Sequence, residues 1–145
     1  MIREATREDV ACIAEMALMI WGSHLEELAE EFEMALNNEE CAIYLYQIDN
    51  MPIGFAQCGL RHDYVEGTES SPVGYLEGIF IQGDYRRKGY ARALMVECEK
   101  WAKKKGCSEF ASDCELDNNV SLAFHMKMGF TEAGRIICFT KPIER

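Results

Sequence analysis

The stretch LEGIFIQGDYRRKGYARALM, residues 76–95, decides the fold of this chain. Its first part belongs to an apolar run over residues 74–81 that is typical of a buried strand, and the apolar spacing after Gly89 predicts a helix. Three consecutive cations stand between them, at residues 86–88. The first turn of a helix carries unpaired N–H groups and a partial positive charge, so this loop suits an anion such as a diphosphate. The alternative is a solvated turn in which the cations only surround the helix start.

Strand and helix signals follow one another along the rest of the chain. Residues 41–48 and 51–60 are apolar, β-branched and aromatic, and the Asp49-Asn50 pair between them predicts a hairpin. The resulting order predicts an α/β (α+β) fold, a mixed sheet with helices on both faces, and the length of 145 residues predicts one domain over residues 1–145. Further strands are expected at residues 2–4 and 108–113, a second hairpin at 131–142, and helices at 10–21, 25–37, 89–105 and 118–128.

Composition restricts the partners and the location. The chain has 25 Asp and Glu against 15 Lys and Arg and a formal net charge of −10, which disfavours nucleic acid and suits a cationic ligand. Seven scattered cysteines lack a C-x-x-C pair and a histidine cluster, so they predict reduced thiols and no metal site. The N-terminus is charged throughout, and no apolar run approaches the roughly 20 residues of a membrane span. We therefore expect a soluble, cytoplasmic protein without a membrane partner.

Two motifs carry a family resemblance. The loop lacks G-x-x-x-x-G-K-[ST] and G-x-G-x-x-G, so neither a P-loop nor a Rossmann site is supported. Instead, Arg86-x-x-Gly89-x-Ala91 after a strand resembles the acyl-CoA-binding motif of the GNAT superfamily of N-acetyltransferases. The stretch DNNVSLAFHMKMGF, residues 117–130, is similar to that superfamily's second motif, Asn-x-x-Ala-x-x-x-Tyr-x-x-x-Gly-Phe.

This resemblance implies a GNAT fold of about seven strands and about four helices, with acetyl-CoA as cosubstrate. Backbone groups on the strand at residues 79–81 would pair with the pantetheine arm like an added strand. The loop and first helical turn would hold the pyrophosphate, and Asn118 would contact the far end of the cofactor. The implied cofactor-binding residues are Ile79, Phe80, Ile81, Arg86, Arg87, Lys88, Gly89, Tyr90, Ala91, Arg92 and Asn118.

Two side chains are candidates for acid–base chemistry. Glu77 lies four residues before Ile81, which predicts that both side chains share one face and that Glu77 points into the cleft as a base, acting through water. The alternative is a carboxylate that only binds substrate charge. His125 stands where most relatives have a tyrosine that protonates the departing thiolate. Histidine can donate a proton near neutral pH, or it can merely contact the cofactor sulfur or its helix neighbours.

A narrower resemblance concerns the acceptor. The segments RHDYVEGTESSPVGYLEGIF and FASD and the second motif together resemble one branch of the aminoglycoside 6'-N-acetyltransferases. It implies that the aminoglycoside site is lined by five residues and that Tyr64 comes from the other subunit of a homodimer. These substrate-binding residues are Trp21, His24, Tyr64, Glu77 and Asp113.

Ordinary structural roles stand beside these assignments. Trp21 ends an apolar helix stripe and could be core, His24 and Tyr64 could be loop residues, and Asp113 could cap a turn. Gly134 departs from the branch, which has an acid at this place.

Besides an aminoglycoside acetyltransferase, two hypotheses remain: an acetyltransferase for a small polyamine or other cellular amine, and a non-catalytic acyl-CoA-binding module.

Overall fold

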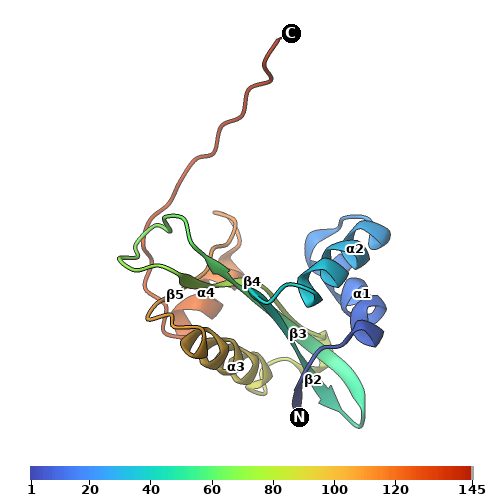
Figure 1. Ribbon diagram of the computed structural model, residues 1–145. Helices are drawn as coiled ribbons and strands as arrows, with labels where there is room; N and C mark the ends of the chain where they lie inside the picture. The colour runs from blue at the N-terminus through green and yellow to red at the C-terminus, as the bar shows by residue number, and fades with distance from the viewer. Residues whose placement is uncertain (145) are drawn as a thin grey trace. The chain divides into compact units, whose positions relative to one another are not determined.

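The computed structural model describes residues 1–144, which form two compact units divided after Asp113. The first unit holds a five-stranded sheet in the order β1-β2-β3-β4-β5 (Figure 1). Neighbouring strands are antiparallel except β4 and β5, which are parallel. The strands are β1 (Ile2–Glu4), β2 (Cys41–Ile48), β3 (Met51–Arg61), β4 (Val73–Ile81) and β5 (Phe110–Ala111).

Helices cover both faces of this sheet, as the sequence predicts. The helices α1 (Val10–Trp21) and α2 (Leu25–Leu36) lie on one face, and α3 (Tyr90–Lys104) lies on the other (Figure 1). Short 3-10 turns precede α1 (η1, Arg7–Asp9) and α3 (η2, Gly83–Tyr85). The second unit contains α4 (Asn119–Lys127). The predicted mixed sheet with four helices is confirmed.

Each face of the sheet has its own apolar layer. Under α1 and α2, the rings of Phe32 and Phe55 meet edge to face at 5.8 Å, and both side chains are fully buried. Under α3, Leu94, Met95 and Cys98 are fully buried, which confirms the apolar face that the spacing predicts. Fully burying one such large side chain stabilises the fold by about 1.5–3 kcal/mol.

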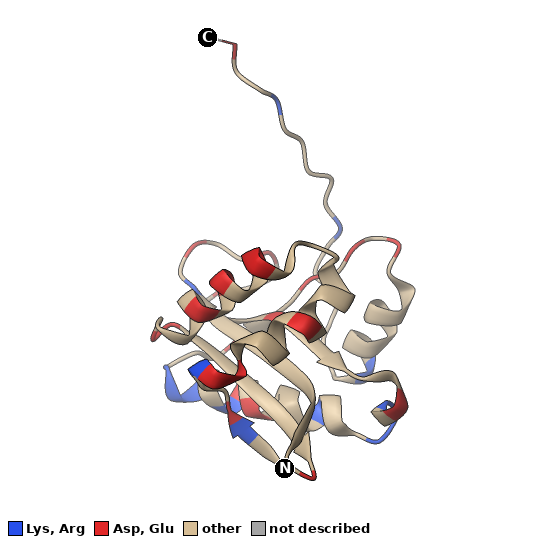
Figure 2. Cartoon of the chain, turned by 90° about the vertical axis from the view of Figure 1, so that its right-hand side faces the viewer, with Lys and Arg blue, Asp and Glu red and all other residues tan. Residues whose placement is uncertain are grey.

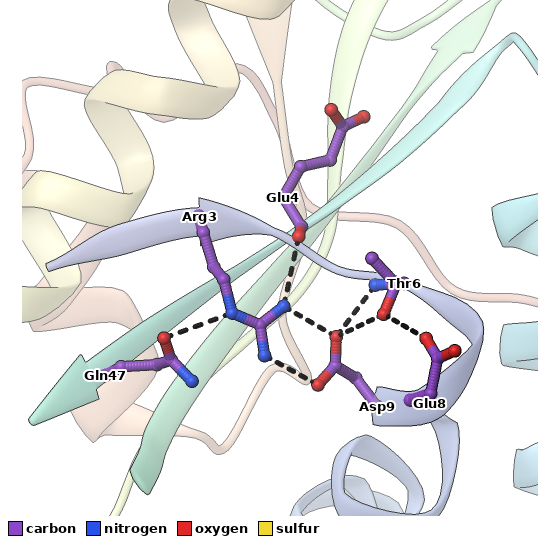
Figure 3. A network of polar contacts seen from close by, with 6 residues as sticks. All are labelled: Arg3, Glu4, Thr6, Glu8, Asp9 and Gln47. Carbon is purple, nitrogen blue, oxygen red and sulfur yellow. Dashed lines mark hydrogen bonds and ion pairs between the residues drawn. The ribbon is translucent and has the colours of Figure 1, made fainter. Parts of the chain in front are cut away.

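A polar network joins β1 to β2 and to the start of α1 (Figure 3). Two nitrogens of the Arg3 guanidinium donate to the two Asp9 oxygens, each at 2.7 Å, and the Thr6 backbone N–H donates to Asp9 Oδ2 at 2.8 Å. Arg3 Nε donates to Gln47 Oε1 on β2 at 3.1 Å. The hydrogen bond from Arg3 is the largest of several effects that lower the pKa of Asp9 to about 2.

Two predictions about the C-terminal part are wrong. Among the described residues the sheet has five strands rather than about seven, and the hairpin expected at residues 131–142 is absent. The only turn signal there, Ala133-Gly134, leaves too few residues before it for a first strand. The apolar residues after it are exposed instead, Ile137 by 79% and Phe139 by 87%. The strand expected at residues 108–113 is reduced to β5.

All seven cysteines are free thiols, of which Cys58 and Cys98 are buried and Cys114 and Cys138 are exposed. A hydrogen bond with Cys98 and burial raise the pKa of Cys58 above its ordinary value. Within residues 1–144 no group of three or more His, Cys, Asp or Glu is arranged to hold a metal ion. None of the helices in this range combines the length and the apolar character needed to cross a membrane.

Candidate active site

A hollow of about 410 Å³ lies between the helices α1 and α2 and the sheet. Two of its lining residues, Trp21 and Glu77, are predicted substrate-binding residues. The helix α2 contributes Glu31 and carries five glutamates without a Lys or Arg, and Figure 2 shows acidic positions on the side of the chain that bears these helices. The hollow is therefore an acidic site suited to a cation. Its lining is Trp21, Ser23, Leu28, Glu31, Phe32, Cys41, Gln57 and Glu77.

Trp21 belongs both to the apolar layer and to the lining of the hollow. Its ring stacks on Phe32 at 6.2 Å and meets Phe55 edge-on at 6.5 Å, so it closes the apolar layer below the hollow. It nevertheless remains 43% exposed. The indole lies directly over β4, where a Cβ at Gly78 would come within 2.6 Å of Trp21 Cζ2. The position of the indole therefore depends on a glycine at residue 78.

A β-bulge in β4 aims Glu77 into this hollow. Gln57 of β3 is opposite Gly78 and Cys58 is opposite Leu76, so Glu77 is the extra residue of β4. Bulges of this kind redirect a side chain relative to the regular alternation of a strand. The Glu77 carboxylate is thereby brought to the α1–α2 face, where it lines the hollow with Gln57 and Cys41.

The bulge overturns the prediction that Glu77 and Ile81 share a face. A Cβ at Gly54 would meet Ile81, whereas a Cβ at Gly59 would lie 3.8 Å from Glu77 Oε2. Gly54 and Gly59 are five positions apart in a stretch of β3 whose pairing with β2 is unbroken. Side chains five positions apart on a regular strand point to opposite faces. The simple alternation of residues therefore predicts the wrong face for one of the two side chains.

Glu77 is held by a chain of polar contacts within the first unit. Arg61 Nη2 donates to both carboxylate oxygens, at 2.8 Å and 3.1 Å, and the guanidinium carbon lies 3.9 Å above the centre of the Tyr75 ring. The Tyr75 hydroxyl donates to Asp113. The hydrogen bond to Glu77 raises the pKa of Arg61, and burial followed by the bond to Asp113 raises the pKa of Tyr75. The chain thus connects Glu77 and Asp113, two of the predicted substrate-binding residues.

The far end of β4 offers an open edge beside the predicted cofactor residues. Ile79, Phe80 and Ile81 pair with β3, but the parallel strand β5 pairs only with Gly74 and Tyr75. The second edge of β4 beyond Tyr75 therefore has no strand partner among residues 1–144. An extended, amide-containing chain such as pantetheine could add there as a strand does.

The loop after β4 has a backbone suited to a phosphate. Gly89 is the N-cap of α3 with a φ of 83°, and Arg87 also has a positive φ, of 65°. Left-handed residues in such loops turn successive N–H groups toward one side and form an anion-binding concavity. Arg86 has a different contact, because its Nε donates to the Ile81 carbonyl at 2.9 Å and so ties the loop to β4. Lys88 lies 5.8 Å from the Tyr85 ring.

The remaining helix-start residues differ in how they are held. Tyr90 stacks on Tyr46 of β2, with ring centres 4.3 Å apart, whereas Ala91 is half-buried and Arg92 is exposed in the first turn of α3. A smaller hollow of about 250 Å³ near the end of β4 is lined by Met19, Phe80, Gln82, Gly83 and Asp84. An open strand edge and a helix N-terminus are features that an acyl-CoA uses for its amide-containing arm and its phosphates.

The second unit carries two further predicted residues, Asn118 and His125. Asn118 is the N-cap of α4, and its side-chain oxygen accepts from the Ser121 N–H at 3.0 Å. His125 Nδ1 lies 2.7 Å from the Ser121 carbonyl oxygen, which can only accept, so Nδ1 carries a hydrogen. Proton donation through Nε2 therefore requires the imidazolium form.

Three predicted substrate-binding residues, His24, Tyr64 and Asp113, do not line the hollow. His24 is an exposed N-cap of α2 next to Ser23, which does line it. Tyr64, in the segment between β3 and β4, is 77% exposed. Their assignment as substrate contacts stays a prediction.

Sequence reasoning missed Arg61 and Tyr75, although they contact the predicted residues directly. Arg61 ends a strand and Tyr75 lies within one; both belong to the segment at residues 61–80 that carries the narrower resemblance, but that resemblance implies no role for either of them. A signal was present in the alternation of polar and apolar residues, since Arg61 and Glu77 are the only charged residues in the two paired strands β3 and β4. Opposite charges on neighbouring strands attract each other, and this pair is the one ion pair that the two strands could form between themselves.

The fold and these features define an acetyltransferase. Residues 7–130 match the Acetyltransferase (GNAT) family, and the chain belongs to this family.

Several similar proteins within this family are aminoglycoside acetyltransferases. The chain is 40% identical over 144 residues to an aminoglycoside N(6')-acetyltransferase type 1 from Stenotrophomonas maltophilia, covering 99% of this chain and 94% of that protein. A protein of the same name from Acinetobacter haemolyticus is 37% identical over 151 residues, covering 99% of both chains. The chain also resembles the apo crystal structure of an aminoglycoside antibiotic 6'-N-acetyltransferase from Acinetobacter haemolyticus, with a TM-score of 0.96, 35% identity and 99% of both chains covered. Against AAC(6')-Iy in complex with the bisubstrate analog CoA-S-monomethyl-acetylneamine, the TM-score is 0.93 at 33% identity, covering 99% of this chain and 98% of that one.

Proposed function

We propose that this protein is an acetyl-CoA-dependent N-acetyltransferase that acetylates the 6'-amino group of aminoglycoside antibiotics and so confers resistance. The observation that carries the proposal is the acidic hollow beside the open edge of β4. It brings the exposed face of Trp21, from α1, together with Glu77 of β4, the strand that leads to the cofactor loop. The near full-length similarity to aminoglycoside 6'-N-acetyltransferases supports the choice of acceptor.

The chain's own residues supply binding, orientation and proton transfer. Acetyl-CoA brings a thioester that an uncharged amine can attack. Because an aminoglycoside amine is protonated near neutral pH, a base must first remove a proton from it. Glu77 fills this role, directly or through a water, since its carboxylate lines the hollow. The positively charged loop at residues 86–88 and the start of α3 hold the cofactor's phosphates by charge and by backbone N–H groups.

The departing thiolate needs a proton, and His125 is the proposed donor. Its Nδ1 is engaged by the Ser121 carbonyl, so the proton would leave from Nε2 of the imidazolium. In this proposal Asn118 contacts the far end of the cofactor.

The substrate side of the site matches a polycation in charge and shape. Glu77 and Glu31 line the hollow, and Asp113 is linked to it through Tyr75. Carboxylates pair with the ammonium groups of an amino sugar, and the indole of Trp21 offers an aromatic face for a cation. His24 and Tyr64 complete the proposed substrate contacts from exposed positions.

We further propose that the protein acts as a cytoplasmic homodimer. The exposed apolar side chains of the tail support association, because Ile136, Ile137 and Phe139 are each more than 70% exposed. Free thiols throughout the chain are typical of a reducing compartment. Light scattering of the full chain and of Phe139→Ser tests the dimer, which the substitution should weaken.

The function is tested by following thiol release from acetyl-CoA with kanamycin or tobramycin as acceptor and spermidine in parallel. Mass spectrometry should find one added acetyl group on the aminoglycoside, and an aminoglycoside with a hydroxyl at the 6' position should not react. A higher kcat/KM for spermidine would assign the enzyme to cellular polyamines. Cofactor binding without thiol release on any amine would indicate a non-catalytic module.

A further inference from the structure

The carboxylate proposed as the base already has a cation bound to it. Arg61 Nη2 lies within 3.1 Å of both Glu77 oxygens, and an arginine side chain is protonated at every physiological pH. The contact crosses from the last residue of β3 to the bulge of β4. An ammonium group of a substrate would bind to the same carboxylate oxygens. Arg61 and the substrate amine therefore compete for Glu77.

The surroundings of Arg61 allow it to withdraw. Its side chain is 45% exposed, so the guanidinium has access to water when it leaves Glu77. The guanidinium already lies 3.9 Å above the Tyr75 ring while it pairs with Glu77, so this contact can be kept when the carboxylate is released, and the Tyr75 hydroxyl donates to Asp113. Glu77 itself is 33% exposed at the hollow, where a ligand can reach it. The pair is consequently placed for exchange rather than sealed in the core.

We propose that Arg61 is an internal cation that occupies Glu77 in the substrate-free protein and is displaced by an ammonium group of the substrate. It is a specificity-determining residue, since it sets how tightly the hollow binds cations. This inference rests on the proposed function for the identity of the amine. Deleting a charged side chain beside a binding site usually weakens binding. Removal of Arg61 should instead tighten the binding of the cationic acceptor.

The experiment measures affinity rather than turnover. Tobramycin is titrated calorimetrically into the full-length protein without acetyl-CoA, for the wild type, Arg61→Met and Arg61→Lys. Arg61→Met should lower the Kd about tenfold, the size expected when a like charge a few ångströms away is removed from a partly exposed site. Arg61→Lys keeps the charge and should stay within about threefold of the wild type. Arg7→Met is the matched control, because Arg7 is 73% exposed and pairs with Glu33 away from the hollow.

Unchanged or weaker binding of tobramycin by a folded Arg61→Met protein would overturn the proposal. Equally tightened binding by Arg7→Met would also overturn it, because the effect would then come from the net charge of the protein and not from Arg61. Failure of the wild type to bind tobramycin would refute the proposed function instead. The Arg61–Glu77 pair is then tested without substrate, from the ¹H–¹⁵N signals of the Arg61 guanidinium. Glu77→Gln should change these signals, and identical signals in both proteins would contradict the pairing.

Discussion

Replacing Asp9 with asparagine should remove the charge that holds β1 and the start of α1 together. The Asp9 carboxylate accepts hydrogen bonds from Nη1 and Nη2 of Arg3, each at 2.7 Å, and the residue is only 8% exposed. Asparagine has nearly the same shape and can still accept from the Thr6 N–H, so the substitution removes the charge together with one of the two oxygens that accept from Arg3. The free energy of unfolding is the quantity to measure.

Its magnitude follows from the pKa of Asp9, which falls from 3.8 to about 2 on folding. Each pKa unit corresponds to about 1.36 kcal/mol, so the ionised carboxylate stabilises the folded state by about 2 kcal/mol at neutral pH. Because the folded-state pKa is the lower one, this stabilisation is present above about pH 4 and is lost as the pH falls through about 2.

Urea unfolding followed by circular dichroism at several pH values tests this expectation. Asp9→Asn should be less stable than the wild type by about 2 kcal/mol at pH 7, and the difference should shrink toward zero near pH 2. Glu33→Gln, which removes an exposed partner of Arg7, should cost less than about 1 kcal/mol. A difference for Asp9→Asn that is the same at pH 7 and pH 2.5 would refute the electrostatic reasoning.

Three further predictions concern the site. Gly78→Ala puts a methyl group 2.6 Å from Trp21 Cζ2, so the indole must shift by about 1 Å. The kcat/KM for the amine should then fall by up to about a hundredfold, while the KM for acetyl-CoA stays constant. Steady-state kinetics with both substrates measures the two values. Arg87→Ala should weaken CoA binding by about 1–3 kcal/mol in calorimetry, and unchanged affinity would argue against the phosphate role of the loop. Glu77→Gln should lower kcat for the aminoglycoside, because the amide cannot take up the proton of the ammonium group; an unchanged kcat would exclude Glu77 from this role.

Local sequence signals predict most of this fold well. The Asp49-Asn50 pair adopts positive φ values of 52° and 64°, as a tight hairpin turn requires, and the apolar spacing of α3 matches its buried face. These features depend on neighbours within a few positions along the chain. The tail differs because the apolar residues after Gly134 indicate that a strand is possible but not which strand it would pair with. Pairing partners come from tertiary structure, which single-sequence patterns do not contain.

The site shows the same division between local and distant information. The start of α3 could be located from Gly89 and the preceding cations, because a helix N-terminus is encoded locally. The face on which Glu77 lies could not, since it depends on a bulge opposite Gln57 and Cys58, in another strand. Arg61 was missed for a related reason: its contact with Glu77 spans sixteen positions in the sequence and a strand boundary.

The distribution of the free cysteines has a practical consequence for detecting coenzyme A with a disulfide reagent. The exposed thiols of Cys114 and Cys138 will react with such a reagent and release its chromophore before any turnover occurs. Cys58, buried and with a raised pKa, will stay silent until the protein unfolds. The slow phase of the absorbance increase therefore measures unfolding of the protein. The absorbance that comes from the exposed protein thiols must be subtracted in assays at high protein concentration.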